Sequence, residues 1–296
     1  MNDAFYDMSV CYNTIAKFEL GLSLGMNGTM TLERSLIQTH SHVWRLVAPN
    51  PSPMTGPGTN TYLVGGQRLI IIDPGPASET HLENIVVAMQ TLKAEAQAIV
   101  VTHSHSDHSS GATALAQRLG VPLLSFGDPL QPGDTIILDE PPPSSPAPMR
   151  GFIPHPSSLT VLHTPGHIHA HVCLWLAEPR LLFAGDLVAG QGTILIIPPD
   201  GDMAAYLNSL RAMLALAPAA ILPGHGPVIE DPPTLLQEYI DHRLQREQQV
   251  LDWLAQGYTT AVEIAARIYA DRPEALDIAT LQVEAHLEKL RREGRA

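Results

Sequence analysis

The chain has 296 residues, 45% of them hydrophobic and 16% charged, and a formal net charge of −13. The length is that of about two domains, and the composition excludes an intrinsically disordered chain. The negative charge opposes non-specific binding to nucleic acid or anionic lipid, and no apolar stretch reaches the roughly 20 residues that a membrane span needs.

Residues 1–38 form an N-terminal extension of unknown role. Asp3, Asp7 and Glu19 are scattered among its apolar residues, and no basic stretch precedes them, so the segment is not typical of a secretory signal. The chain has two cysteines, too few for a framework of several disulfides. Both observations favour a reducing compartment, and we expect a cytoplasmic protein.

Short apolar runs that indicate strands alternate with helical patterns after the extension. The runs lack polar alternation, which is typical of strands buried on both faces, so we expect layers of helix to flank them. The predicted strands are 62–64, 69–72 and 99–101, and the predicted helices are 82–92 and 112–119.

Residues 139–158 contain seven prolines and cannot supply a regular ladder of backbone donors. We interpret them as a long surface loop within the domain, because strand patterns resume after them. A helix with a cap at Asp202 follows. The predicted elements of this part are strands 159–162, 181–183 and 220–222 and a helix over 203–214.

The last part of the chain has three helical patterns. The first covers 234–255 and is broken by Gly257. The second begins with a predicted capping box formed by Thr260 and Glu263, and the third runs from about Pro273 to Arg292. The predicted division is an extension (1–38), a main domain (39–230) and a C-terminal helical module (231–296).

Potential metal ligands cluster directly after the predicted strand 99–101, at His103, His105, Asp107 and His108. A lone histidine is more often an ordinary surface or core residue. Here the pattern recurs, because the next three predicted strands are followed by further residues of ligand type. Imidazole and carboxylate groups suit zinc and its neighbours in the first transition row, and a loop at a strand end can direct several of them to one centre. These further residues are His167, Asp186 and His225.

With these residues the chain resembles the metallo-β-lactamase superfamily, whose HxHxDH motif is matched by residues 103–108. The resemblance implies an α/β (α+β) fold, a four-layer αββα sandwich that binds two zinc ions, with manganese or iron as alternatives. It implies that His103, His105 and His167 hold one metal, that Asp107, His108 and His225 hold the other, and that Asp186 bridges them.

Motifs at 51–55, 58–65, 206–210 and 223–227 narrow the resemblance to the β-lactamase-like protein 2 subgroup. His242-Arg243 and the helices that follow are similar to the winged-helix-like C-terminal domain of that subgroup. Ser104 and Ser106 depart from it, because a bulky aromatic and a basic residue usually stand at these positions. The departures bear on the substrate and not on metal binding.

The resemblance implies a binuclear hydrolase that uses a hydroxide bridging two metals. Asp107 is predicted to orient this nucleophile and relay its proton. His171, four residues after His167, is predicted to be catalytic, either by touching the substrate or by supporting a ligand. Asp73 is predicted to tie down the metal loop by hydrogen bonds, the alternative being a simple turn residue. Cys173 and His163 are predicted to be packing residues.

Three functions remain open. The first is hydrolysis of a small carboxyl derivative such as a thioester, lactone or β-lactam, the second is cleavage of single-stranded RNA, and the third is a non-catalytic interaction module. Binding of RNA would need a strip of basic residues on the surface, but acidic residues intersperse the candidates, which is also typical of an ordinary solvated helix face. Aromatic residues, on which bases could stack, make up only 5% of the chain. We favour a small-molecule substrate, and expect the C-terminal module to cover the active-site mouth or form a homodimer. The candidate strip is Arg243, Arg246, Lys289, Arg291, Arg292 and Arg295.

Overall fold

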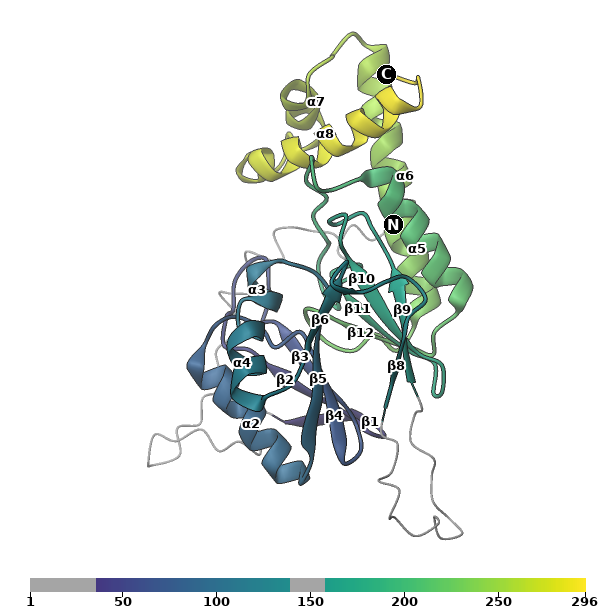
Figure 1. Ribbon diagram of the computed structural model, residues 1–296. Coiled ribbons are helices and arrows are strands. Elements are labelled where there is room, and N and C mark those ends of the chain that lie inside the picture. Colours follow the sequence, from purple (N-terminus) through teal and green to yellow (C-terminus); the bar gives the residue numbers. More distant parts are fainter. Residues whose placement is uncertain (1–35, 139–157) are drawn as a thin grey trace.

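Two β-sheets form the centre of the protein in the computed structural model, which describes residues 36–138 and 158–296 (Figure 1). The first sheet has the strand order β1-β2-β3-β4-β5-β6-β7 and the second the order β12-β11-β10-β9-β8. The strands of the first sheet are β1 (Ile37–His40), β2 (Val43–Val47), β3 (Asn60–Gly65), β4 (Arg68–Ile72), β5 (Glu95–Val101), β6 (Leu123–Phe126) and β7 (Pro129–Leu130). Those of the second are β8 (Thr135–Ile137), β9 (Ser158–His163), β10 (Val172–Leu176), β11 (Leu181–Gly185) and β12 (Ala220–Pro223).

Helices cover the outer faces of both sheets (Figure 1). On the first sheet lie α2 (Glu79–Leu92) and α4 (Ala112–Leu119), and on the second α5 (Met203–Leu216) and α6 (Pro232–Ala255). A one-turn helix, α3 (Ser106–Ser109), follows β5 at one edge of the first sheet. The predicted αββα sandwich is therefore confirmed.

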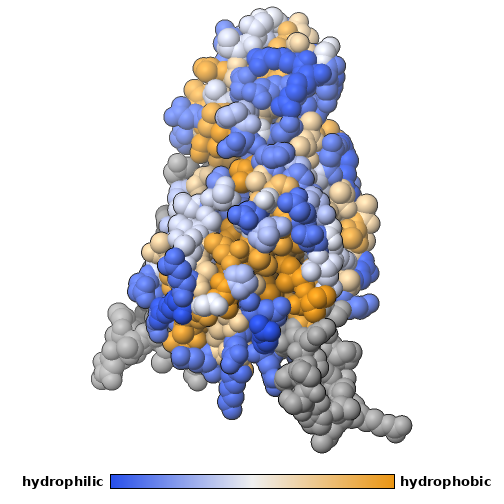
Figure 2. Space-filling model, viewed as in Figure 1, coloured by the Kyte–Doolittle hydropathy of each residue, from blue (hydrophilic) through white to orange (hydrophobic). Residues whose placement is uncertain are grey.

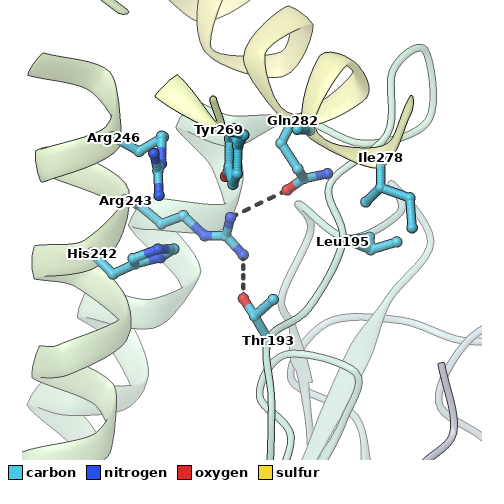
Figure 3. Close-up of a pocket in the computed structure, with 9 residues that line it drawn as sticks. Thr193, Leu195, His242, Arg243, Arg246, Tyr269, Ile278 and Gln282 are labelled. Carbon is cyan, nitrogen blue, oxygen red and sulfur yellow. Dashed lines mark hydrogen bonds between the residues drawn. The ribbon is translucent and has the colours of Figure 1, made fainter. Parts of the chain in front are cut away.

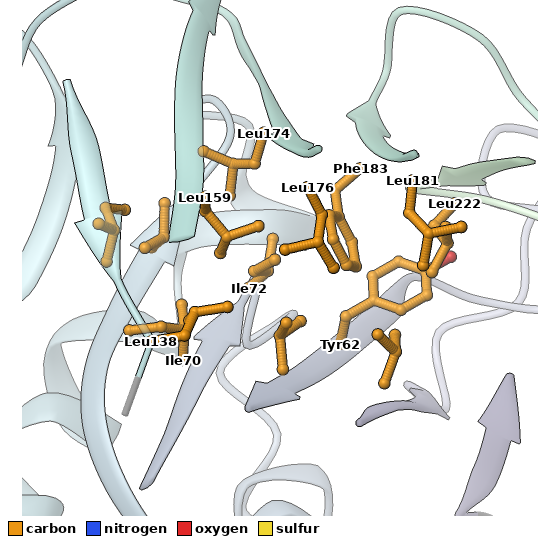
Figure 4. Packing of buried hydrophobic residues seen from close by; sticks show 14 of the residues in the cluster. Tyr62, Ile70, Ile72, Leu138, Leu159, Leu174, Leu176, Leu181, Phe183 and Leu222 are labelled. Atoms are coloured by element: carbon orange, nitrogen blue, oxygen red, sulfur yellow. The ribbon is translucent and has the colours of Figure 1, made fainter. Parts of the chain in front are cut away.

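Strand β4 shows why the central runs have no polar alternation. Ile70 and Ile72 point between the sheets, where they join Phe183 of the opposite sheet (Figure 4). Leu69 and Ile71 pack under the helices on the other face. Burial on both faces was predicted correctly. The cover on the inner face is the other sheet, however, and not a layer of helix.

The predicted strands and helices of the main domain are all present, and α4 has the predicted bounds. Asp202 caps α5, since its side chain accepts a hydrogen bond from the backbone N–H of Ala205. The pattern missed β1, β2, β6, β7, β8 and β10. β1 begins at Ile37 and so crosses the predicted boundary between 38 and 39, while the domain division itself stays a prediction. The predicted proline-rich loop and nearly all of the extension lie outside the described residues.

The predicted C-terminal module begins with α6, whose first half packs on the second sheet and whose second half extends beyond it (Figure 1). It adds α7 (Ala261–Ile268), the short 3-10 helix η3 (Pro273–Ala275) and α8 (Leu276–Arg292), around a core of its own that includes Val250, Ile264 and Val283. The predicted capping box between Thr260 and Glu263 is present. The visible surface of the module is largely hydrophilic, whereas apolar residues gather over the sandwich (Figure 2). In the described ranges, no helix combines the length and apolarity needed to cross a bilayer.

A buried histidine in the module makes its stability depend on pH. Burial, together with the charges of Arg243, Arg246, Lys289 and His242, lowers the pKa of His286 well below its ordinary value, although Nδ1 lies 4.0 Å from a carboxylate oxygen of Glu247. Folded His286 therefore stays neutral while the unfolded chain takes up a proton below about pH 6.5. This contribution to stability is present above that pH and is lost as the pH falls.

We expect His286→Leu to reduce this dependence. Between pH 7.5 and 5.5, the free energy of unfolding of the wild type should fall by about 1.4 kcal/mol more than that of the variant. Urea unfolding at the two pH values measures the difference. An equal decline in both proteins would mean that His286 takes up its proton within the fold.

Candidate metal centre

The predicted ligand residues come together at one edge of the sandwich, where four strands end. β5 leads into His103, β9 is followed by the turn that carries His167, β11 leads into Asp186, and β12 into His225. The prediction of a loop after β5 needs one correction. Asp107 lies in the first turn of α3, so only the residues before Ser106 form an open loop.

The first group of ligand atoms comes from His103, His105, His167 and Asp186. Nδ1 of His105 lies 3.1 Å from Nε2 of His103 and 2.9 Å from Nε2 of His167. The Oδ2 atom of Asp186 lies 3.9 Å from Nε2 of His103 and 3.7 Å from Nε2 of His167. His105 is exposed and His103 is buried, so the group opens to solvent on one side.

The second group comes from Asp107, His108 and His225, with the other oxygen of Asp186 beside it. The two Nε2 atoms of His108 and His225 are 3.2 Å apart, and Oδ2 of Asp107 lies 3.5 Å and 3.3 Å from them. Oδ1 of Asp186 lies 3.4 Å from Nε2 of His108 and 3.5 Å from Nε2 of His225. Asp186 thus presents one carboxylate oxygen to each group.

These separations fit metal ions. A tetrahedral site with bonds of about 2.0–2.1 Å has ligand atoms about 3.3 Å apart. His167 uses the proton on Nδ1 for the carbonyl of Leu195, at 2.7 Å, so its Nε2 presents a lone pair to the other ring nitrogens. Among the described residues, Oδ1 of Asp186 is buried without a hydrogen-bond partner. Lone pairs and a bare carboxylate oxygen that face one another are the arrangement that a cation stabilises.

Asp73 holds both groups in place, as the sequence predicted. Its carboxylate accepts hydrogen bonds from the backbone N–H of Thr102 at 2.7 Å, from Nδ1 of His108 at 2.9 Å and from the hydroxyl of Thr102 at 2.7 Å. That hydroxyl accepts in turn from Nδ1 of His103 at 3.1 Å. One buried carboxylate therefore orients a histidine of each group and leaves the Nε2 atoms to face the centre.

Carboxylates and histidines stabilise each other's charged forms in the second group and at Asp186. Burial would raise the pKa of Asp186, but His108 and His225 hold it well below its ordinary value. Burial opposes protonation of His225, but Asp186 and Asp107 raise its pKa to about 9. The same competition, with Asp186 and Asp73 as the carboxylates, raises the pKa of His108 well above its ordinary value. Cations bound here would take the place of these protons.

The comparisons with known proteins agree with this geometry. The sequence family described as the Metallo-beta-lactamase superfamily matches residues 54–225, more than half of the chain. The chain belongs to the metallo-β-lactamase superfamily. A second family, the Beta-lactamase associated winged helix domain, matches residues 260–296, which include α7 and α8.

Three similar proteins agree with membership of this superfamily. A Drosophila melanogaster protein named beta-lactamase-like protein 2 homolog is 36% identical over 283 residues, covering 90% of this chain and 93% of its own length. An Aspergillus chevalieri protein named atrochrysone carboxyl ACP thioesterase is 33% identical over 262 residues, covering 84% and 79%. The crystal structure of a beta-lactamase domain protein from Burkholderia ambifaria shares the fold, with a TM-score of 0.72, 19% identity and coverage of 90% and 91%. The predicted subgroup resemblance is confirmed.

His171 lies behind the two groups of ligand residues and not in their opening. Its side chain is fully buried, Nε2 accepts the backbone N–H of Asp186 at 3.1 Å, and Nδ1 lies 2.8 Å from the hydroxyl of Thr164. Burial and the nearby His167 lower the pKa of His171 to about 3, so the ring is neutral. With both nitrogens bonded and the side chain buried, the arrangement favours the second of the two predicted roles, support of a ligand, here Asp186, over contact with a substrate.

Other contacts of the centre were missed by the sequence analysis. The side-chain amide of Asn60 donates to the carbonyls of Pro223 and Gly226, each at 2.9 Å, and so fixes the turn that carries His225. The carbonyl of Leu195 holds His167. Asn60 lay within a motif of the superfamily subgroup, but a backbone carbonyl has no signal in the sequence.

The packing residues were predicted correctly. His163 stacks on Phe126 with ring centroids 4.4 Å apart, and Cys173 is buried, which raises the pKa of its thiol to about 12.

The basic strip considered for RNA is largely paired within the chain. Arg243 is buried and bonds to neutral oxygens of the 193–194 segment and Gln282, and Arg246 lies over the ring of Tyr269. The others form ion pairs with acidic residues, so no open row of cations results. These pairs are Lys289 with Glu247 and Glu293, Arg291 with Glu284, Arg292 with Asp202 and Glu288, and Arg295 with Glu247 and Glu293.

Proposed function

We propose that the protein is a hydrolase that depends on two metal ions and acts on a small carboxyl derivative. The observation that carries the proposal is the division of seven ligand residues into two groups that share Asp186. His103, His105 and His167 would hold one ion, Asp107, His108 and His225 the other, and Asp186 would contact both.

The donor set fits zinc, with iron or manganese as alternatives, because all its atoms are imidazole nitrogens or carboxylate oxygens. When bound, two such ions supply a water molecule of lowered pKa and a Lewis acid for the electrophilic carbonyl. The protein supplies the rest. Asp73 and His171 hold ligands in fixed orientations, and burial of most of the centre excludes bulk water.

Asp107 is the residue best placed to handle a proton. Its side chain is 27% exposed, against 11% for Asp186, so it faces the opening. The nearby His225 and His108 outweigh the effect of burial and lower the pKa of Asp107, which keeps it ionised. An ionised carboxylate at the mouth orients an attacking water molecule and accepts its proton.

A thioester is the substrate class we favour among thioesters, lactones and β-lactams. The name of the Aspergillus chevalieri relative describes a thioesterase, and that relative aligns with most of this chain. The ion pairs of the C-terminal module leave RNA without a matching basic surface. The cytoplasmic location and the homodimer remain predictions.

A substrate panel tests the proposal. The metal-loaded protein is assayed with acyl thioesters, lactones, a chromogenic cephalosporin and labelled single-stranded RNA, beside Asp107→Asn. We expect thioester hydrolysis that falls at least about 100-fold in the variant, the usual contribution of a general base. Asp134→Asn, a change in an exposed turn, is the matched control and should keep full activity.

Other results of the panel would contradict parts of the proposal. Fewer than two metal ions per chain would end the binuclear assignment. Cleavage of RNA alone, lost in Asp107→Asn, would identify an endoribonuclease. Two bound metals without turnover of any substrate would favour the non-catalytic module.

A further inference from the structure

The segment 193–196 joins the C-terminal module to the metal centre. It belongs to no helix or strand, so its backbone groups need partners from elsewhere in the fold. In its middle, the carbonyl of Leu195 accepts the hydrogen bond from Nδ1 of His167 at 2.7 Å. The position of this carbonyl therefore sets the direction in which Nε2 of His167 points.

Two side chains of the module hold the segment on either side of Leu195. Arg243 of α6 donates to the carbonyl of Ile194 at 2.5 Å and to the hydroxyl of Thr193 at 3.0 Å. Gln282 of α8 donates to the carbonyl of Ile196 at 3.0 Å and accepts from its N–H at 3.3 Å.

Arg243 and Gln282 also bond to each other, at 3.2 Å (Figure 3). Figure 3 shows Arg243 reaching from its helix to both Thr193 and Gln282. The two helices thus hold the segment through one connected network.

Arg243 and Gln282 are polar side chains in a buried place, where each needs defined hydrogen-bond partners. Arg243 and Gln282 are only 3% and 6% exposed. Burying a guanidinium costs free energy unless it is hydrogen-bonded, and the oxygens to which Arg243 donates are those of a side-chain amide, a hydroxyl and a backbone carbonyl, all neutral. Arg243 also lies over the ring of Tyr206, whose backbone packs so closely on Gly166, next to His167, that a Cβ there would lie 2.3 Å from Cα of Tyr206.

We propose that Arg243 and Gln282 are positioning residues for His167, through which the docked C-terminal module sets the metal affinity of the first group. This inference rests on the proposed metal function. It gives the module a role at the centre without contact to substrate. The second group has no such link, because His108 and His225 bond to Asp73 and to the carbonyl of Gly58 instead.

Metal affinity in half-site variants tests the inference. His225→Ala leaves the first group intact and His103→Ala leaves the second. Zinc affinity is measured in each by competition with a chromophoric chelator, before and after adding Gln282→Met, which keeps the side-chain length and removes both hydrogen bonds to Ile196. We expect Gln282→Met to weaken zinc binding about 10- to 100-fold in the His225→Ala background and to leave it unchanged in the His103→Ala background.

Two further variants separate positioning from general stability. Lys289→Met removes a buried ion pair from the same helix without touching 193–196 and should leave both affinities unchanged. Gln282→Glu keeps the acceptor for the N–H of Ile196 and should lose less zinc affinity than Gln282→Met. It therefore tests the inference even if Gln282→Met folds poorly. The inference would be overturned if Lys289→Met and Gln282→Met weakened zinc binding equally in the His225→Ala background, or if neither weakened it. Absence of zinc binding by the wild type would instead refute the proposed function.

Discussion

Asp186→Asn should lose both metal ions and reduce hydrolysis by more than about 100-fold, since even partners outside the ligand set change metal affinity or activity by 10- to 100-fold. The change conserves the volume of the side chain but removes the one carboxylate that faces both groups of ligands. It also removes one negative charge from beside His108 and His225, whose remaining carboxylate neighbours are Asp107 and, at His108, Asp73. Metal content after dialysis and the rate of thioester hydrolysis measure the two effects.

The control for Asp186→Asn is Asp134→Asn, which removes a carboxylate of similar size from an exposed turn and should bind two metals. Thermal unfolding of both variants shows whether the fold is kept. A folded Asp186→Asn protein that still binds two ions tightly would contradict the role of Asp186 as the shared ligand.

Gly224→Ala should disable the second group of ligands although it changes no ligand. A Cβ at this position would lie 2.6 Å from Oδ1 of Asp186 and 2.6 Å from Cε1 of His108, closer than real Cβ atoms approach their neighbours. Both side chains must move, and a displacement of about 1 Å in a reacting group is enough to reduce a rate about 100-fold. We expect a loss of that size or larger, with fewer than two metals per chain.

Gly133→Ala controls for the general effect of losing a glycine. Gly133 has a φ of +88°, so an alanine there strains a surface turn by roughly 1–2 kcal/mol. The added Cβ has no atom within 4 Å and so contacts no other residue. It should lower the midpoint of thermal unfolding slightly and leave metal content unchanged. If Gly224→Ala bound two metals as Gly133→Ala does, the space at residue 224 would not matter for the centre.

The sandwich was predictable because its central strands are marked by composition. The run 69–72 is apolar throughout, since successive residues face the opposite sheet and the helices in turn. β10 (Val172–Leu176) was missed although it is as apolar as the recognised runs, and β7 and β8 are too short, at two and three residues, to stand out. β1 and β2 mix polar with apolar residues, and their place beside β3 depends on pairing between strands.

The ligand residues were predictable because they stand at strand ends and match a known motif. Their partners were predictable only in part. Asp73 follows a strand and matches a usual position of the superfamily, and its bonds to Thr102 and His108 are as expected. For His171 the sequence left two roles open, contact with the substrate or support of a ligand, because only packing shows that both ring nitrogens are bonded.

The sequence by itself determined the fold family, and it singled out seven candidate ligand residues and the class of chemistry they suit, because side-chain type and local periodicity are written in it directly. The tertiary structure brought these residues into the two groups that the resemblance implied. It also decided that the basic residues of the C-terminal module are paired, and that Arg243 and Gln282 hold the carbonyl behind His167. These contacts join residues tens of positions apart, often through backbone atoms that every residue shares, so only the packing of the module on the sandwich distinguishes them.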